Sequence, residues 1–220
     1  MVRLLLYSGG IDSLIAWYYL NYPDCLYVDL GTKYSVNEQW GLIAPEGMKL
    51  KTITHKSWGK YEFEDAWLPM RNALLTMLAA AEGADIIYLV AQKGEQGIPD
   101  RSPQFFEDMS RFLTLHNKRE IVVEPVFPHM DKQEMVKWYL DQGYDPGRLV
   151  RAFSCYSRES PCGRCSACWR KFIALTVNGI KCDHIFRNDV RMWGEVNYRS
   201  RLDEYIPERV GAMKKVMGWV

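Results

Sequence analysis

The chain lacks an excess of either charge, a long apolar run and any low-complexity segment. Its 28 Lys and Arg residues against 27 Asp and Glu leave a formal net charge of +1, so we expect no general attraction to nucleic acid or to an anionic membrane. No apolar run is long enough to span a bilayer. One basic residue, Arg3, precedes the first short apolar run and no small-residue cleavage pattern follows. We therefore expect no secretory signal and a cytoplasmic protein.

Histidine is scarce too: the 4 histidines show no metal-ligand spacing, which argues against a histidine-based metal site. In a cytoplasmic protein, the 6 cysteines are expected to be thiols or metal ligands rather than disulfides. A hydrophobic content of 48% over 220 residues is enough for a full core, as one domain or one domain with an appendage.

Apolar runs alternate with helix-period segments along most of the chain. The predicted strands are residues 2–7, 25–30, 49–54, 86–91 and 121–126. The predicted helices are residues 11–19, 36–43, 73–82, 103–116, 132–142 and 166–177. This alternation predicts an α/β fold whose parallel sheet is covered on both faces by helices. Gly, Pro, Arg and Cys dominate after residue 143, so we expect an α/β domain over 1–143 and a smaller C-terminal region over 144–220.

A loop with two glycines, here called the glycine loop, directly follows the first predicted strand. It reads Ser8-Gly9-Gly10-Ile11-Asp12-Ser13. Adjacent glycines permit close approach of a ligand, and the helix that follows offers unpaired N–H groups, which together suit a phosphate. It is not a Walker loop, because no Gly-Lys-Ser/Thr follows at the required spacing. Asp12 would repel a bare phosphate but accepts a nucleotide carried with Mg²⁺; the alternative is a helix capped by Ser8 or Asp12.

Four cysteines lie close together in the pattern C-x6-C-x2-C-x2-C. They are Cys155, Cys162, Cys165 and Cys168. Four thiolates at these spacings can surround one tetrahedral Zn²⁺, and since no position remains for water, the zinc would be structural. An iron–sulfur cluster is the alternative, although the fourth cysteine lies upstream and Pro161 precedes the run. Cys25 and Cys182 stand alone and are expected to be buried as small hydrophobic residues.

The glycine loop and the cysteine run together resemble the 7-cyano-7-deazaguanine synthases of the PP-loop ATP pyrophosphatase superfamily. Residues 68–72 (LPMRN) are similar to that family's Pro-x-Arg-Asn motif, and residues 97–105 (GIPDRSPQF) resemble its Gly-Tyr-Pro-Asp-Cys-Arg-Pro-Glu-Phe stretch. Residues 130–134 (MDKQE) and 153–156 (FSCY) continue the correspondence in the same order. The resemblance covers residues 2 to 180 and implies a three-layer PP-loop sandwich with a small zinc-binding region.

The resemblance implies an ATP-dependent ligase that converts 7-carboxy-7-deazaguanine and ammonia into the nitrile through adenylated intermediates and an amide. It implies ATP bound at residues 8–13, with Mg²⁺ near Asp12 and hydroxyls of Ser8 and Ser13 on the departing pyrophosphate. Arg71 is expected to clamp a phosphate or the substrate carboxylate, and Lys132 to contact phosphate. We expect Asp12, Ser13, Arg71 and Lys132 to be catalytic, and Arg71, Asn72 and Asp100 to bind the substrate.

Several of these residues also have a purely structural interpretation. Arg71 would be a solvated arginine just before a helix, Asn72 a helix N-cap and Asp100 a turn residue. Asp131 and Glu134 form the D-x-x-E pattern of a capping box.

The chain departs from the family pattern in two stretches. Residues 29–34 (DLGTKY) differ from the family's Asp-Tyr-Gly-Gln-Arg-His, and Ile98 and Arg101-Ser102 replace its aromatic and Cys-Arg positions. We therefore keep two alternatives: a PP-loop enzyme that adenylates another acceptor, such as a tRNA base or a protein end group, and a non-catalytic zinc module that binds nucleic acid. The tail 189–220, without a counterpart in these motifs, is expected to close the fold or to form the interface of a homodimer.

Overall fold

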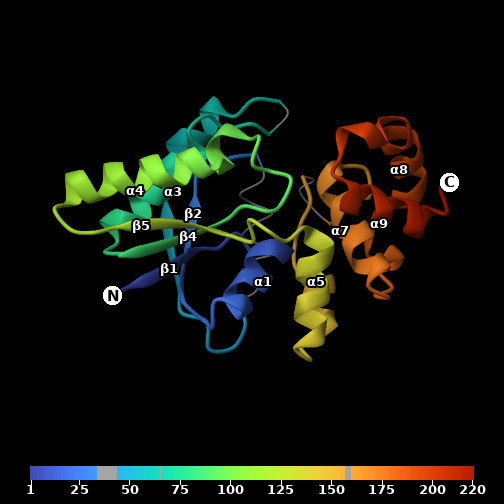
Figure 1. The fold of residues 1–220 in the computed structure, drawn as a ribbon, viewed down its shortest axis with the longest axis horizontal. Helices are drawn as coiled ribbons and strands as arrows, with labels where there is room; N and C mark the ends of the chain where they lie inside the picture. The colour runs from blue at the N-terminus through green and yellow to red at the C-terminus, as the bar shows by residue number, and fades with distance from the viewer. Residues whose placement is uncertain (34–43, 65, 157–159) are drawn as a thin grey trace.

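A five-stranded parallel sheet in the order β3-β2-β1-β4-β5 forms the centre of the protein (Figure 1). The computed structural model describes residues 1–33, 44–64, 66–156 and 160–220. Its strands are β1 Arg3–Leu6, β2 Asp24–Asp29, β3 Leu50–Thr54, β4 Ile86–Val90 and β5 Val122–Val126. Each neighbouring pair is parallel, so the expected α/β fold is confirmed. The predicted strands agree with these bounds to within one residue at each end.

Helices cover both faces of the sheet, as the alternation predicts. One face carries α1 (Ile11–Tyr19) and α5 (Lys132–Asp141), and the other carries α3 (Arg71–Ala81) and α4 (Pro103–Asn117). Strand β1 shows why. Leu5 is buried in the first of these cores, whereas Leu4 and Leu6 are buried in the second, because successive side chains of a strand point to opposite faces.

The direction of the chain reverses at β1. From β1 the chain moves outward through β2 to β3, then returns to place β4 and β5 on the other side of β1. The segments that follow β1 and β4 therefore diverge, and in doubly wound sheets a ligand crevice opens at this point of the carboxyl edge. The glycine loop follows β1, so the fold places it there.

The C-terminal region consists of helices that lie beyond the carboxyl edge of the sheet (Figure 1). They are α6 Pro146–Arg151, α7 Ser166–Val177, α8 Val190–Tyr198 and α9 Pro207–Met217. Helix α7 packs against α5 on one side and against α8 and α9 on the other. The tail is thus two helices that cover α7, and Trp169 of α7 contacts the rings of Phe172, Tyr198 and Trp219.

Several helix starts differ from the sequence expectation. Helix α6 was not anticipated, although Asp145 caps it and Pro146 opens it, a usual start signal. Helix α3 begins at Arg71, two residues earlier than expected, so Arg71 lies in the helix and not before it. Asn72 is not the N-cap, because Met70 holds that position with a φ of 57°. The helix predicted over 36–43 lies outside the described residues.

Other boundaries agree well. Helices α1 and α7 have the predicted bounds, and α4 and α5 differ by one residue at the C-terminal end. The capping box of Asp131 and Glu134 is present at the start of α5. Short 3-10 turns lie at Lys56–Tyr61, Pro99–Arg101, Asp183–Ile185 and Arg199–Glu204.

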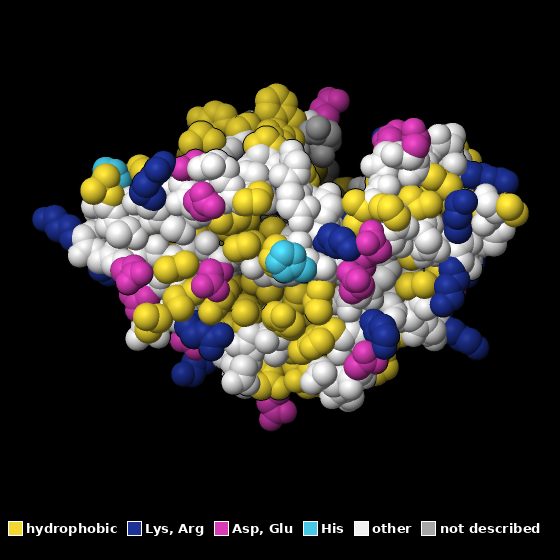
Figure 2. All heavy atoms as spheres, viewed as in Figure 1, with side chains coloured by type: hydrophobic (Ala, Val, Ile, Leu, Met, Phe, Trp, Pro, Cys, Tyr) yellow, Lys and Arg dark blue, Asp and Glu magenta, His cyan; other side chains and the backbone are white. Residues whose placement is uncertain are grey.

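Charges of both signs are interspersed over the face of the molecule drawn in Figure 2, as the near-zero net charge suggests. Within the described ranges, no helix combines the length and the apolar character needed to cross a membrane.

Gly194 of α8 allows that helix to lie directly on Trp169. A Cβ at residue 194 would lie 2.1 Å from the Trp169 ring, so we expect Gly194→Ala to lower the free energy of unfolding by about 1–3 kcal/mol. Gly211 of α9 is the matched control, because a Cβ there meets nothing within 4 Å. Gly211→Ala should be neutral or stabilising. Urea unfolding of both variants checks this, and equal stability of Gly194→Ala and wild type would contradict the packing described.

Candidate functional site

The glycine loop is shaped by its own hydrogen bonds, and none of its side chains caps the start of α1. Gly9 has a φ of 76°, a conformation that favours glycine. Gly10 is the N-cap of α1, so the alternative of a cap by Ser8 or Asp12 is wrong; among the first-turn N–H groups, that of Ile11 donates to the Ser154 hydroxyl at 3.4 Å. The Ser13 hydroxyl donates to the Gly10 carbonyl at 3.1 Å and accepts from the Ser8 N–H at 3.3 Å. The first turn of α1 therefore offers N–H groups beside a tightly held loop.

A cavity of about 530 Å³ lies at the carboxyl edge of the sheet and is bounded on its far side by α7. Its volume is within the range of small-molecule sites. Most residues singled out from the sequence line it. They are Ser8, Gly10, Asp12, Ser13, Arg71, Asn72, Asp100, Lys132 and Cys155. Gly9 and Ile11 are outside this lining; Ile11 is fully buried and its N–H donates to the Ser154 hydroxyl at 3.4 Å.

The start of α3 and the 3-10 turn at Pro99–Arg101 form one wall of the cavity. Arg71 is the first residue of α3 and is partly buried. Asn72 is buried, and its side-chain amide donates to the Asp100 carbonyl at 3.0 Å. Asn72 thus holds the turn that carries Asp100, and this fixes the position of the Asp100 side chain at the cavity. The two stretches that resemble one family therefore meet in space.

Lys132 and Asp12 form an ion pair across the cavity floor. Lys132 is the first residue of α5, and its ammonium donates to both carboxylate oxygens of Asp12. Only 10% of the Lys132 side chain is exposed. Burial lowers the pKa of Lys132, and the adjacent carboxylate of Asp12 opposes this shift. The ammonium thus neutralises the one acidic group of the glycine loop.

A second charged group surrounds Glu95, which sequence reasoning did not single out. Glu95 lies in the loop after β4 and is 5% exposed. Its Oε1 is 2.7 Å from Nη1 of Arg101 and 3.7 Å from Nη1 of Arg170, and its Oε2 accepts the Gln92 N–H at 3.2 Å. The positions of these residues in the sequence could have indicated a role at the site. Glu95 follows β4, which ends at the switch point of the sheet, and Arg170 lies two residues after Cys168.

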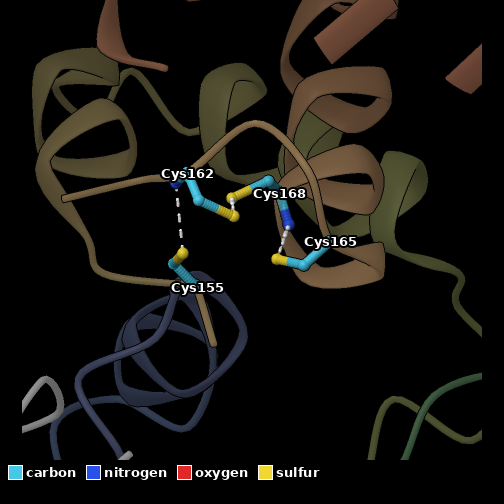
Figure 3. Close-up of side chains that lie close together, drawn as sticks. All are labelled: Cys155, Cys162, Cys165 and Cys168. Atoms are coloured by element: carbon cyan, nitrogen blue, oxygen red, sulfur yellow. Dashed lines mark hydrogen bonds between the residues drawn. The ribbon is translucent and has the colours of Figure 1, made fainter. Parts of the chain in front are cut away.

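The four clustered cysteines converge beside the cavity, and Figure 3 shows their sulfur atoms turned toward a common point. All four sulfurs lie within 4.8 Å of one another. Sulfurs about 2.3 Å from one zinc ion are about 3.8 Å apart, so this spacing suits a single ion. A four-iron cluster holds each thiolate on a different iron and spaces the sulfurs more widely. Cys165 is the N-cap of α7, and Cys168 lies in its first turn.

Backbone N–H groups point at three of these sulfurs, as thiolate ligands require. The Cys162 N–H lies 3.2 Å from the sulfur of Cys155, the Arg164 N–H 3.3 Å from that of Cys162, and the Cys168 N–H 3.4 Å from that of Cys165. Hydrogen bonds from Cys155 and Cys168 lower the pKa of the Cys165 thiol. The donor set fits zinc.

The tight turn of this cluster depends on one glycine. Gly163 has a φ of 71°, and a Cβ there would lie 2.4 Å from the Asn188 carbonyl oxygen. The remaining cysteines, Cys25 and Cys182, are 0% exposed and lie in the core, as expected.

The comparison with protein families agrees with this geometry. The family model described as "Queuosine biosynthesis protein QueC" matches residues 41–179 of this 220-residue chain. This chain belongs to the QueC family. The matched range contains the four clustered cysteines and all the cavity residues named above from Arg71 onward, whereas the glycine loop precedes it.

Curated relatives share the name 7-cyano-7-deazaguanine synthase. The protein of Marinobacter nauticus is 31% identical over 119 residues, which are 51% of this chain and 52% of that protein. The protein of Marinomonas sp. is 29% identical over 130 residues, covering 55% and 58%. That of Saccharolobus solfataricus is 32% identical over 130 residues, covering 54% and 27%. The chain thus spans about half the length of the first two relatives.

Removal of one clustered sulfur should remove the metal. We expect Cys165→Ala to lose most of a zinc content near one ion per chain and to lower the unfolding temperature, because the remaining three ligands leave the start of α7 unfixed. Cys182→Ala removes a more deeply buried sulfur outside the cluster and should keep its zinc. Elemental analysis by mass spectrometry measures both. Equal zinc contents in the two variants, or iron in place of zinc in the wild type, would contradict this assignment.

Proposed function

We propose that this QueC-family chain is an ATP-dependent carbon–nitrogen ligase that converts 7-carboxy-7-deazaguanine and ammonia into 7-cyano-7-deazaguanine. The observation that carries the proposal is the cavity of about 530 Å³, in which the glycine loop, Arg71, Asp100 and Lys132 meet. Family membership and the shared name of the relatives support the same activity.

The reaction must overcome the poor leaving ability of a carboxylate oxygen. The substrate carboxylate attacks the α-phosphorus of ATP, a P–O bond to the β-phosphate breaks and pyrophosphate leaves. Ammonia then displaces AMP and gives the amide and a proton. In a second activation the amide oxygen attacks the α-phosphorus of another ATP, pyrophosphate leaves again, and loss of AMP with the two amide N–H protons gives the nitrile.

The residues of the cavity suit these steps. Ser8, Gly10 and Ser13 line the cavity, and the two serine hydroxyls, with the N–H groups at the start of α1, would bind the phosphates that take up negative charge. The Lys132 ammonium would offset the negative charge of Asp12 while pyrophosphate leaves. Mg²⁺ bound near Asp12 would screen the triphosphate. Asp100 and Arg71 then face the acceptor, Asp100 as an acceptor for the ring N–H and amine of a guanine-like base.

One feature of the cavity favours a different acceptor as the second candidate. Ile98 and Arg101, two positions that depart from the family stretch, both line the cavity. If they select the ring, the same adenylation would serve another acceptor. The formal net charge of +1 gives little support to a nucleic-acid-binding module. No membrane partner is part of the proposal.

The decisive experiment incubates the zinc-loaded chain with ATP, 7-carboxy-7-deazaguanine and ammonium and identifies the products by mass. We expect the amide and then the nitrile, with AMP formed only when the acid is present. Asp12→Ala should abolish AMP formation, and although it lowers the unfolding temperature by leaving the Lys132 ammonium without its carboxylate, the chain should stay folded. AMP formation with another acceptor and none with the acid would overturn the substrate but not the reaction type.

The ammonium of Lys132 predicts a pH dependence of nucleotide affinity. Since burial lowers the pKa of Lys132 in the folded chain, its positive charge is complete below that lowered pKa and is lost as the pH rises through it. We therefore expect affinity for Mg-ATP to fall as the pH rises, over a range below the usual lysine pKa of about 10.4. Calorimetric titrations across this range measure the affinity.

Lys137 supplies the control for this titration, because it lies on the same helix and pairs with Asp141 at the surface. Lys137→Gln should keep the alkaline loss of affinity, whereas Lys132→Gln should bind Mg-ATP weakly at every pH. An unchanged alkaline loss in Lys132→Gln would assign it to another group.

A further inference from the structure

Arg101 and Arg170 both contact the Glu95 carboxylate, but the contact of Arg170 is long. Arg101 comes from the turn after β4 and Arg170 from α7, so two distant elements bring their guanidinium groups to one buried carboxylate. The Arg101 contact, at 2.7 Å, is a charged hydrogen bond. The Arg170 contact, at 3.7 Å, is an ion pair that is too long for a hydrogen bond. The Nη1 group of Arg170 therefore makes no close hydrogen bond to Glu95.

Arg170 also carries an unsatisfied group. Its Nε is buried and has no hydrogen-bond partner within the described ranges. Its side chain is 33% exposed, and the residue lines the cavity. A guanidinium prefers a planar partner that takes two parallel hydrogen bonds, and a carboxylate is such a partner. Glu95 already shows that a carboxylate fits between the two guanidinium groups.

The position of Arg170 links the two charged groups of the cavity. Its guanidinium interacts electrostatically with Glu95 and with Asp12 of the glycine loop, and its charge also reaches Lys132. Arg170 lines the same cavity as Asp12, Lys132 and Arg101, and its guanidinium lies 3.7 Å from Glu95. In the proposed reaction a carboxylate must approach a triphosphate of the same charge, and a cation between them reduces this repulsion.

We propose that Arg170 and Arg101 form an acceptor-carboxylate subsite, distinct from the phosphate-binding glycine loop, and that Glu95 positions both guanidinium groups. This proposal rests on the proposed function. It assigns the residues by which the enzyme would select an acid as its acceptor. Arg170 binds the carboxylate on the side that faces the glycine loop, so that a carboxylate oxygen is held toward the α-phosphorus. Arg101, held at 2.7 Å by Glu95, contributes the second cation.

The test compares three ligands on the full zinc-loaded chain by calorimetry. The ligands are 7-carboxy-7-deazaguanine, the ring without its carboxylate, and a non-hydrolysable ATP analogue with Mg²⁺. We expect Arg170→Gln to weaken binding of the acid ~10- to 100-fold, while its affinity for the bare ring and for the ATP analogue stays within about twofold of wild type. Arg170→Lys, which keeps the charge but not the planar fork, should be intermediate.

Two further variants separate this role from a structural one. Arg101→Gln removes the second guanidinium without touching α7 and should also weaken only the acid. Arg164→Gln is the matched control, since Arg164 is an exposed arginine of the same cysteine segment outside the cavity lining, and it should bind all three ligands as wild type does.

The outcomes distinguish the subsite from the function. Unchanged affinity of Arg170→Gln and Arg101→Gln for the acid, in a wild type that makes the nitrile, overturns the subsite alone. An equal loss for the ATP analogue assigns Arg170 to the phosphates and overturns the subsite as well. A wild type that binds the ATP analogue but not the acid overturns the proposed function and the subsite with it.

Discussion

Four sulfur atoms within 4.8 Å of one another fix the start of α7, and α7 closes the cavity at the carboxyl edge of the sheet. Cys165 caps the helix and Cys168 lies in its first turn, so the geometry of the cluster sets where the helix begins. Cys155 belongs both to the cluster and to the cavity lining. A metal bound there would therefore be structural in its chemistry, yet it would shape the site directly.

The cavity combines two ways of handling negative charge. At the glycine loop, Gly10, Asp12 and Ser13 line the cavity at the start of α1, and the single acid, Asp12, is neutralised by Lys132. At the opposite wall, a buried carboxylate holds two arginines. Since α1 and α5 cover one face of the sheet and α3 covers the other, the switch point of the sheet brings these groups to one crevice.

Much of the fold could be predicted because its signals are local. The strands show as apolar runs, α1 follows the glycine turn directly, and the Asp131–Glu134 capping box opens α5. The start of α3 was predicted two residues late. Its N-cap, Met70, adopts a φ of 57°, and a methionine in the sequence does not indicate this conformation. Helix α6 was missed even though Asp145 and Pro146 carry a local start signal. From the sequence, Asn72 could have been a helix N-cap. The structure shows instead that its side-chain amide donates to the Asp100 carbonyl.

The sequence by itself determined the class of fold and the cluster of four cysteines that could hold a metal, and it predicted a phosphate-binding glycine loop, because each rests on residues close together in the chain. Only the tertiary structure decided which charges meet: Asp12 with Lys132, and Glu95 with Arg101 and Arg170. Asp12 and Lys132 are 120 residues apart in the sequence, and Arg170 reaches Glu95 only because α7 is anchored beside the sheet edge. The pairing of distant charges depends on how the helices pack across the sheet. The periodicity of the sequence does not predict that packing.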